Sequence, residues 1–167
     1  MKILETERLV LRQITVEDAE FILDLLNQPT FVKYIGDRNV RTVEEAGQYI
    51  LSRFVVSYEK FGYGLYLVEL KENKVPIGIC GLVKRDSLPD ADIGFAFLPD
   101  YCSQGYATES ARAIFDYAKD VLKLKRILAI TTKDNENSGK LLEKIGIRFD
   151  RLIRLDGEEL KLFSSDE

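Results

Sequence analysis

Residues 91–111, ADIGFAFLPDYCSQGYATESA, constrain the fold of this chain more than any other stretch. Residues 92–98 are apolar or small after the first and are followed by a proline, a pattern that predicts a buried strand. A helix is expected to open within residues 103–108, after a short turn that contains Gly105. Such a turn leaves free N–H groups at a positive helix end, where a phosphate binds without a basic side chain. The alternative is a plain turn in which Ser103 caps the helix.

The length and composition indicate one globular domain spanning residues 1–167. A chain of 167 residues can bury a sizeable core without metal or disulfide help. Its hydrophobic content is 46% and its mean hydropathy is −0.13, values typical of a soluble protein. The sequence contains no apolar stretch near the ~20 residues of a membrane helix. The first 12 residues lack a signal-peptide layout, so a cytoplasmic location is expected.

The charged and reactive residues exclude several classes of function. A net charge of −4 and a pI of about 5.1 oppose nonspecific binding to nucleic acid. The chain has no histidine, which removes Ser-His and Cys-His couples and, with two distant cysteines, argues against a zinc site. Cys80 and Cys102 are expected to be free thiols. Catalysis must therefore use carboxylates, hydroxyls, tyrosines or backbone dipoles, and nothing indicates an oligomeric state.

Capping boxes and apolar periodicity place the other elements. Thr15 with Asp18, and Thr42 with Glu45, each have the spacing that starts a helix. Before residue 91, we expect a strand at 3–13, a helix from Thr15, a loop at 27–41, a helix from Thr42 to near Gly62, and strands at 64–71 and 75–85. After the central helix, we expect a strand at 126–132, a helix at 135–144 ended by Gly146, and a hairpin of strands at 147–155 and 158–163.

Three separated stretches resemble the GNAT superfamily of acetyl-CoA-dependent N-acetyltransferases. Residues 102–107 resemble its coenzyme-A loop, in which Arg or Gln is followed by two residues, Gly, one residue, and Gly or Ala; Cys102 departs from the first position. Residues 5–12, ETERLVLR, resemble the opening strand of the branch that includes ribosomal-protein N-terminal acetyltransferases. Asn135 and Ser138 match the Asn-x-x-Ser motif of that branch. The resemblance covers nearly the entire chain.

The resemblance implies an α/β fold with a mixed, mostly antiparallel sheet, a central splayed parallel strand pair and about four helices. In the family, the pantetheine arm of acetyl-CoA lies in the gap of that pair and binds a strand edge, while the loop amides bind the pyrophosphate. Asn135 would bind the arm, or act only as a helix cap. The cofactor-binding residues that the resemblance implies are Phe97, Leu98, Ser103, Gln104, Gly105, Tyr106, Ala107, Thr108, Asn135 and Ser138.

The implied activity is acetyl transfer from acetyl-CoA directly to a primary amine, with a protein N-terminal α-amine as one acceptor class and small-molecule amines as another. Asp92 is the candidate general base, its alternative being a solvated strand-end carboxylate. Ser138 is the candidate for steadying the thiolate or the reacting carbonyl. A noncatalytic acyl-CoA sensor and an unrelated nucleotide binder remain open. The sequence lacks the G-x-x-x-x-G-K-[ST] run of a P-loop.

Overall fold

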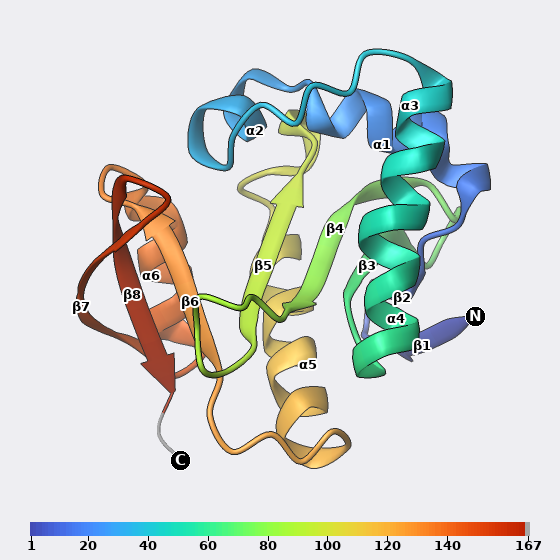
Figure 1. Cartoon of the computed structure of the whole chain (residues 1–167). Coiled ribbons are helices and arrows are strands. Elements are labelled where there is room, and N and C mark those ends of the chain that lie inside the picture. The colour runs from blue at the N-terminus through green and yellow to red at the C-terminus, as the bar shows by residue number, and fades with distance from the viewer. Residues whose placement is uncertain (166–167) are drawn as a thin grey trace.

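A computed structural model describes residues 1–165 as one eight-stranded sheet flanked by helices (Figure 1). The strand order across the sheet is β1-β2-β3-β4-β5-β6-β8-β7. Every neighbouring pair is antiparallel except β5 and β6, which are parallel. The strands are β1 Lys2–Glu5, β2 Leu9–Gln13, β3 Leu65–Leu70, β4 Pro76–Val83, β5 Asp92–Phe97, β6 Leu128–Thr132, β7 Ile147–Leu155 and β8 Glu158–Ser165. The predicted fold class, a mostly antiparallel mixed sheet with one parallel pair, is confirmed.

Helices cover both faces of the sheet. The longest is α5, which packs Ala111, Ile114 and Ala118 onto one face of β4 and β5. The opposite face is covered by α1 and by the long helix formed of α3, η2 and α4, through apolar residues such as Ile22, Ile50 and Phe54. The helices are α1 Ala19–Leu26, α2 Pro29–Tyr34, α3 Val43–Tyr49, η2 Ile50–Val55, α4 Val56–Phe61, α5 Tyr106–Asp120 and α6 Glu136–Lys144. The last, α6, packs against β6 and β7.

Both predicted caps start helices, and the first of them is a complete capping box. The Thr15 side chain accepts from the N–H of Glu17, and its own N–H donates to the Asp18 carboxylate at 2.9 Å. The Thr42 side chain accepts from the N–H of Glu45 at 3.1 Å. The second helix ends where predicted, because Gly62 takes the left-handed φ of 79° that commonly closes a helix.

Two expectations for the N-terminal region are wrong. Residues 3–13 do not form one strand but the hairpin β1–β2, because Thr6 makes a turn in which its N–H donates to the carbonyl of Leu9 and its hydroxyl accepts from the N–H of Leu9. Residues 27–41 are not all loop, because α2 begins at Pro29, whose fixed φ suits a first helical turn. The described chain therefore has one more helix than the resemblance implied.

Candidate active site

The parallel strands β5 and β6 pair at only one position and then separate. Asp92 lies opposite Leu128, and the N–H of Leu128 donates to the carbonyl of Ala91 at 2.9 Å. Beyond this pair, no register position joins the two strands in the described part of the chain. Figure 1 shows the gap widening toward the carboxyl ends of both strands. The expected splayed pair is therefore present, closed at Asp92 and open at the other end.

The backbone direction along β5 decides which residues can offer hydrogen bonds to the gap. The N–H of Leu98 donates to the carbonyl of Ile77 in the preceding strand, β4, at 2.9 Å, and the Leu98 carbonyl accepts from Tyr101. The peptide groups of a strand alternate in direction, so the backbone N–H and C=O groups of Phe95 and Phe97 point toward the gap instead. The geometry thus suits the predicted role of Phe97 and adds Phe95, whereas both backbone groups of Leu98 are already used.

The loop between β5 and α5 presents an uncapped helix N-terminus at the open end of the gap. A short 3-10 turn, Pro99–Tyr101, follows the strand, and Ser103 and Gly105 then take positive φ angles of 63° and 85°. Gly105 is the N-cap residue of α5, and no side chain caps this end. Ser103 is therefore not the cap, and the helix starts at Tyr106. Its first amides, those at Tyr106, Ala107 and Thr108, lack partners within the helix.

The side chains of this loop are largely engaged within the protein. The side-chain amide of Gln104 donates to the carbonyl of Asp100 at 2.6 Å. The thiol of Cys102 points back toward the carbonyls of Phe97 and Leu98, at 3.9 and 3.6 Å. An anion at this loop would therefore meet backbone N–H groups rather than these side chains, as the sequence predicted.

Three residues that sequence reasoning missed brace the start of α5. The side chains of Thr6 and Arg8, in the β1–β2 turn, both donate to the carboxylate of Glu109, with Arg8 Nε to Glu109 Oε1 at 2.7 Å. The backbone N–H of Arg8 donates to Glu109 Oε2 at 2.9 Å. The only available signal was the ETERLVLR stretch itself, because contacts between residues a hundred positions apart leave no local pattern.

The start of α6 lies beside the open end of β6. Asn135 is the N-cap residue, and its Oδ1 accepts from the N–H of Ser138 at 3.3 Å. The N–H of Asn135 donates to the carbonyl of Thr132, the last residue of β6. The hydroxyls of Thr131 and Thr132 are buried, and among the described residues they have no hydrogen-bond partner. The open end of the gap therefore lies next to four polar residues, Thr131, Thr132, Asn135 and Ser138.

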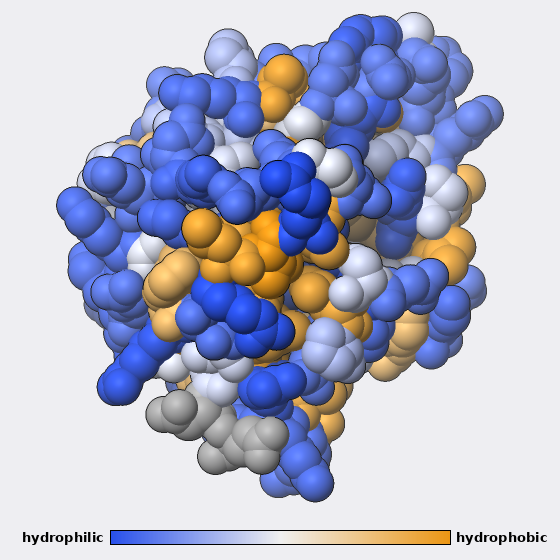
Figure 2. Space-filling view, turned by 60° about the vertical axis from the view of Figure 1, so that its left-hand side comes forward, coloured by the Kyte–Doolittle hydropathy of each residue, from blue (hydrophilic) through white to orange (hydrophobic). Residues whose placement is uncertain are grey.

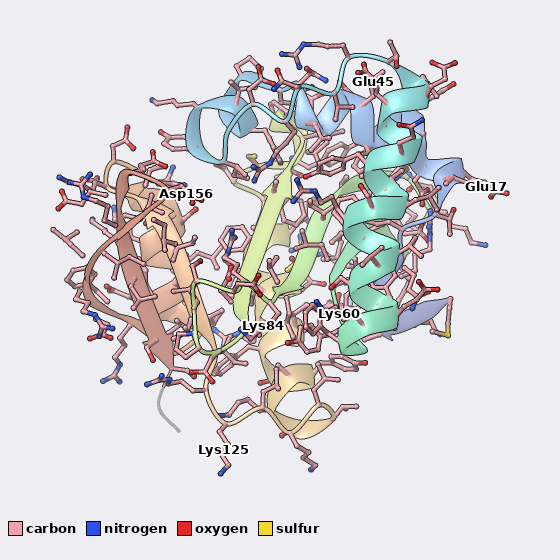
Figure 3. The ribbon with its side chains drawn as sticks, in the orientation of Figure 1. Glu17, Glu45, Lys60, Lys84, Lys125 and Asp156 are labelled. Atoms are coloured by element: carbon pink, nitrogen blue, oxygen red, sulfur yellow. The ribbon has the colours of Figure 1, made fainter. Side chains whose placement is uncertain are left out.

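Asp92 forms a buried ion pair at the closed end of the gap. Its side chain is 2% exposed and accepts from Arg85 Nε at 2.8 Å and from Arg85 Nη2 at 3.3 Å. Burial raises the pKa of Asp92 above its ordinary value, although Arg85 and Lys84 act to lower it. Figure 3 labels Lys84 at the end of β4, where its ammonium donates to the carbonyls of Arg85 and Leu88 and so shapes the loop that carries Arg85. The reading of Asp92 as a solvated carboxylate is therefore wrong.

The structure does not bring Asp92 and Ser138 together. Asp92 lies opposite Leu128, the first residue of β6. Ser138 lies in the first turn of α6, which begins shortly after Thr132, the last residue of β6. Four steps along a strand span ~13 Å at ~3.3 Å per residue. A ligand lying along the gap would thus pass these two residues at different points.

A shallow apolar surface adjoins the closed end of the gap on the face opposite α5. Leu128, Leu162 and Leu88 form a small cluster there, with Ile130 and Ile153 against it. Figure 2 shows apolar atoms gathered at the centre of a face that is otherwise mostly hydrophilic. A cavity of about 230 Å³ opens over these strands. It is lined by Ser87, Leu88, Pro89, Arg126, Leu128, Asp150, Arg151, Ile153, Arg154, Leu155 and Leu162.

The two cysteines are poorly suited to nucleophilic attack. Cys80 is fully buried, and burial raises the pKa of its thiol to about 12. Burial also raises the pKa of Cys102. Within residues 1–165, no group of three or more His, Cys, Asp or Glu side chains is placed to hold a metal ion. Over the same residues, none of the helices has the length and apolarity needed to cross a membrane.

Comparison with known proteins identifies the family. Residues 8–148 match the acetyltransferase (GNAT) domain. The chain is 34% identical over 154 residues to the uncharacterized N-acetyltransferase YoaA of Bacillus subtilis, covering 91% of this chain and 86% of that protein. The family match spans most of the sequence, including the coenzyme-A loop and the Asn-x-x-Ser motif.

Solved structures share the whole fold. An acetyltransferase from Agrobacterium tumefaciens superposes with a TM-score of 0.84 at 25% identity, over 100% of this chain and 95% of that one. The ribosomal L7/L12 alpha-N-protein acetyltransferase RimL in complex with coenzyme A gives a TM-score of 0.83 at 16% identity, over 99% and 98%. That second likeness, at so low an identity, concerns the fold alone. The chain described here belongs to the GNAT acetyltransferases and is an acyltransferase.

Proposed function

We propose that this enzyme moves an acetyl group from acetyl-CoA directly to a primary amine. The observation that carries the proposal is the single backbone pair between β5 and β6, which leaves an open strand edge leading from an uncapped helix N-terminus to a buried carboxylate. The family match supports acetyl-CoA as the co-substrate, and RimL, which shares the fold, has been solved with coenzyme A.

Acetyl-CoA would fit the gap along its whole length. Its pyrophosphate would accept hydrogen bonds from the amides of residues 104–108, at the positive end of α5. Its pantetheine arm has peptide-like groups, which would pair with the free backbone edge at Phe95 and Phe97. Asn135 and the unpartnered hydroxyl of Thr131 would meet the same arm where the gap opens. This orphaned hydroxyl supports the fit, because a buried polar group without a partner is costly.

The thioester would then lie toward the closed end, near Asp92. We propose that Asp92 takes the proton released by the attacking amine, through a water because this residue is almost completely buried. A carboxylate has about four lone-pair sites, so the two hydrogen bonds from Arg85 leave room for that water. The acceptor would approach across the apolar cluster of Leu88, Leu128 and Leu162, which begins one strand away.

The chemistry needs no acetylated cysteine. As the amine nitrogen forms a bond to the carbonyl carbon, the bond from carbon to sulfur breaks and CoA leaves as a thiolate, which is later protonated. A CoA thiol near pKa ~8.5 leaves with little acid help. Ser138, expected from the resemblance to steady the thiolate or the reacting carbonyl, lies toward the open end and would meet the pantetheine arm instead. Both cysteines have raised pKa values, so neither forms a thiolate readily at neutral pH.

A protein N-terminal α-amine is the acceptor class that we propose. At pH 7, an α-amine of pKa ~8 costs about 1 to 1.5 kcal/mol to deprotonate, whereas a lysine-like amine of pKa ~10.4 costs roughly 4 to 5 kcal/mol. A single buried carboxylate paired with an arginine is better suited to an α-amine, because the α-amine is the less costly of the two to deprotonate. The resemblance of residues 5–12, and of Asn135 with Ser138, to ribosomal-protein N-terminal acetyltransferases supports the same class.

An acceptor panel tests this proposal. The enzyme is incubated with acetyl-CoA and either ribosomal-protein N-terminal peptides, polyamines, amino acids or aminoglycosides, and free CoA and acetylated product are both measured. We expect transfer to a peptide α-amine. Transfer only to a small-molecule amine would overturn the acceptor class, and CoA release without any acetylated product would overturn amine acetylation. Binding of ATP or NAD in place of CoA would contradict the co-substrate.

A further inference from the structure

Arg8 connects the N-terminal hairpin to the proposed phosphate loop through one particular peptide group. Its Nη1 donates to the carbonyl oxygen of Gln104 at 3.1 Å. That carbonyl belongs to the same peptide unit as the N–H of Gly105. Because a trans peptide is planar, its C=O and N–H point in opposite directions. Holding the carbonyl of Gln104 toward Arg8 therefore directs the N–H of Gly105 away from Arg8.

We propose that Arg8 is a positioning residue that fixes the Gln104–Gly105 peptide in the orientation needed to bind the pyrophosphate of acetyl-CoA. This inference rests on the co-substrate proposed above. Gly105 needs such support, since a glycine with a φ of 85° sits in a loop whose peptide can turn over at little steric cost. With the peptide reversed, a carbonyl oxygen would face the phosphate and repel it. An arginine that holds one orientation removes that competing state before the ligand arrives.

Besides the Gln104 carbonyl, two groups of α5 hold the guanidinium. Glu109 accepts from its Nε at 2.7 Å, and the ring of Tyr106 lies under it with 4.3 Å from Cζ to the ring centroid. Thr6 and the N–H of Arg8 also donate to Glu109, so the hairpin and the first turn of α5 form one unit. A side chain fixed in this way can fix the peptide that it contacts.

The packing around Gly105 supports the same role. A Cβ built on Gly105 would lie 3.2 Å from Nη2 of Arg8, so Arg8 covers the side of the loop where a side chain would project. Arg8 therefore lies behind the peptide, and the N–H of Gly105 points to the other side. Since Arg8 contacts the peptide rather than the ligand, its effect should depend on the pyrophosphate and not on the 3′-phosphate of CoA.

The test compares ligands that differ in their phosphates. Dissociation constants for CoA and 3′-dephospho-CoA are measured by calorimetry for the wild type and for Arg8→Met, which keeps an apolar stem over Tyr106 but loses every side-chain donor. We expect at least a tenfold loss of affinity, by the same factor for both ligands. Acetyl transfer from acetyl-CoA should show a raised KM with kcat within about twofold. Transfer from S-acetylpantetheine, which has no pyrophosphate, should be unchanged.

Two further variants serve as controls. Lys71→Ala removes another cation that lines the same surface hollow as Arg8 and Tyr106, and it should leave both affinities unchanged. Arg8→Lys, which keeps a donor but not the planar fork, should recover part of the affinity. If Arg8→Met fails to fold, Arg8→Lys carries the comparison, with a loss of several-fold expected for both ligands.

Four outcomes would overturn the inference. One is an Arg8 variant whose CoA affinity is within twofold of the wild type. A loss seen with CoA but not with 3′-dephospho-CoA would make Arg8 a 3′-phosphate ligand instead. An equal loss of activity with S-acetylpantetheine would indicate general damage to the fold. A wild type that binds no CoA would overturn the co-substrate proposal as well, which separates that failure from the other three.

Discussion

Arg85 and Asp92 form a two-point ion pair, with distances of 2.8 and 3.3 Å, around a carboxylate that is almost completely buried. The pair lies where β5 and β6 form their one register pair before separating. Burial alone would favour the protonated acid, and the arginine opposes this effect. Arg85 can therefore keep the proposed base ionised at a site from which water is largely excluded.

Replacing Asp92 should remove general-base catalysis while leaving coenzyme binding intact. We expect Asp92→Asn to lower kcat/KM by ~10² or more with unchanged CoA affinity, since a positioned base typically contributes that much. Ser138→Ala should cost less. Asp90→Asn is the matched control, because Asp90 pairs with Arg126 nearby but is a third exposed. Full activity of Asp92→Asn from pH 6 to 9 would show that another carboxylate or water is the base.

Replacing Arg85 should change the pH dependence of the reaction. The arginine lowers the pKa of Asp92, so Arg85→Gln should raise it and move the acidic limb of kcat/KM to higher pH. The measurement is a pH profile of kcat/KM for the wild type, Arg85→Gln and the control Arg126→Gln. The control should follow the wild type. An Arg85→Gln profile with its acidic limb unmoved would mean that Asp92 does not set this limb.

A side chain at Gly105 should disable the phosphate loop. Gly105→Asp introduces strain at a φ of 85° and places a carboxylate beside Arg8, where it competes with the Gln104 carbonyl for that guanidinium. We expect a loss of CoA affinity greater than tenfold, since a hydrogen bond to a charged group is worth ~1.5 to 3 kcal/mol. Gly62→Asp is the matched control, with a φ of 79° and open space around it. Equal CoA affinities for both variants would remove the loop from the site.

Glu109 should stabilise the fold in a pH-dependent way. Burial would raise its pKa, but hydrogen bonds from Thr6 and Arg8 outweigh this effect and lower the pKa below its ordinary value. A carboxylate with a lowered pKa stabilises the folded state above the pKa of the unfolded chain, and this contribution is lost as the pH falls through the folded pKa. The difference in unfolding free energy between wild type and Glu109→Gln should therefore be present at pH 7.

Chemical denaturation at several pH values measures that difference. It should be roughly 1 to 3 kcal/mol at pH 7, the usual cost of losing hydrogen bonds to a charged group, and should shrink below pH ~4.3. Glu159→Gln provides a comparison, because Glu159 pairs with Lys133 at the surface and is much more exposed. If the difference in unfolding free energy between wild type and Glu109→Gln is constant with pH, the ionised Glu109 carboxylate does not stabilise the fold in this way.

Local sequence patterns predicted most elements of the fold. The apolar run in β5, the caps at Thr15 and Thr42, and the glycines at 62 and 146 each act through neighbours within a few residues. The splayed pair followed from the family resemblance, and the single register pair of Asp92 with Leu128 confirms it. Predictions of this kind succeed because the same few residues determine both the pattern and the structure.

The features that were missed depend on contacts between distant residues. Nothing near Arg8 indicates that it will reach Gln104 and Glu109, and nothing near Asp92 indicates that the 84–91 loop will return Arg85 to it. The expectation that the backbone groups of Leu98 face the gap differs from the structure for another reason. Which residues of a strand face the gap depends on pairing parity with β4, and a shift of one residue reverses it.

Amide hydrogen exchange at Phe95 and Phe97, followed with and without CoA, tests most directly whether the gap between β5 and β6 is the co-substrate site. In the free enzyme these amides face the gap without a strand partner, so they should exchange faster than that of Leu98, which is bonded to Ile77. Saturating CoA should slow exchange at Phe95, Phe97 and the loop amides 105–107 and leave the β1–β2 strands unaffected. If CoA binds and these amides exchange as before, the co-substrate lies elsewhere and the account is wrong.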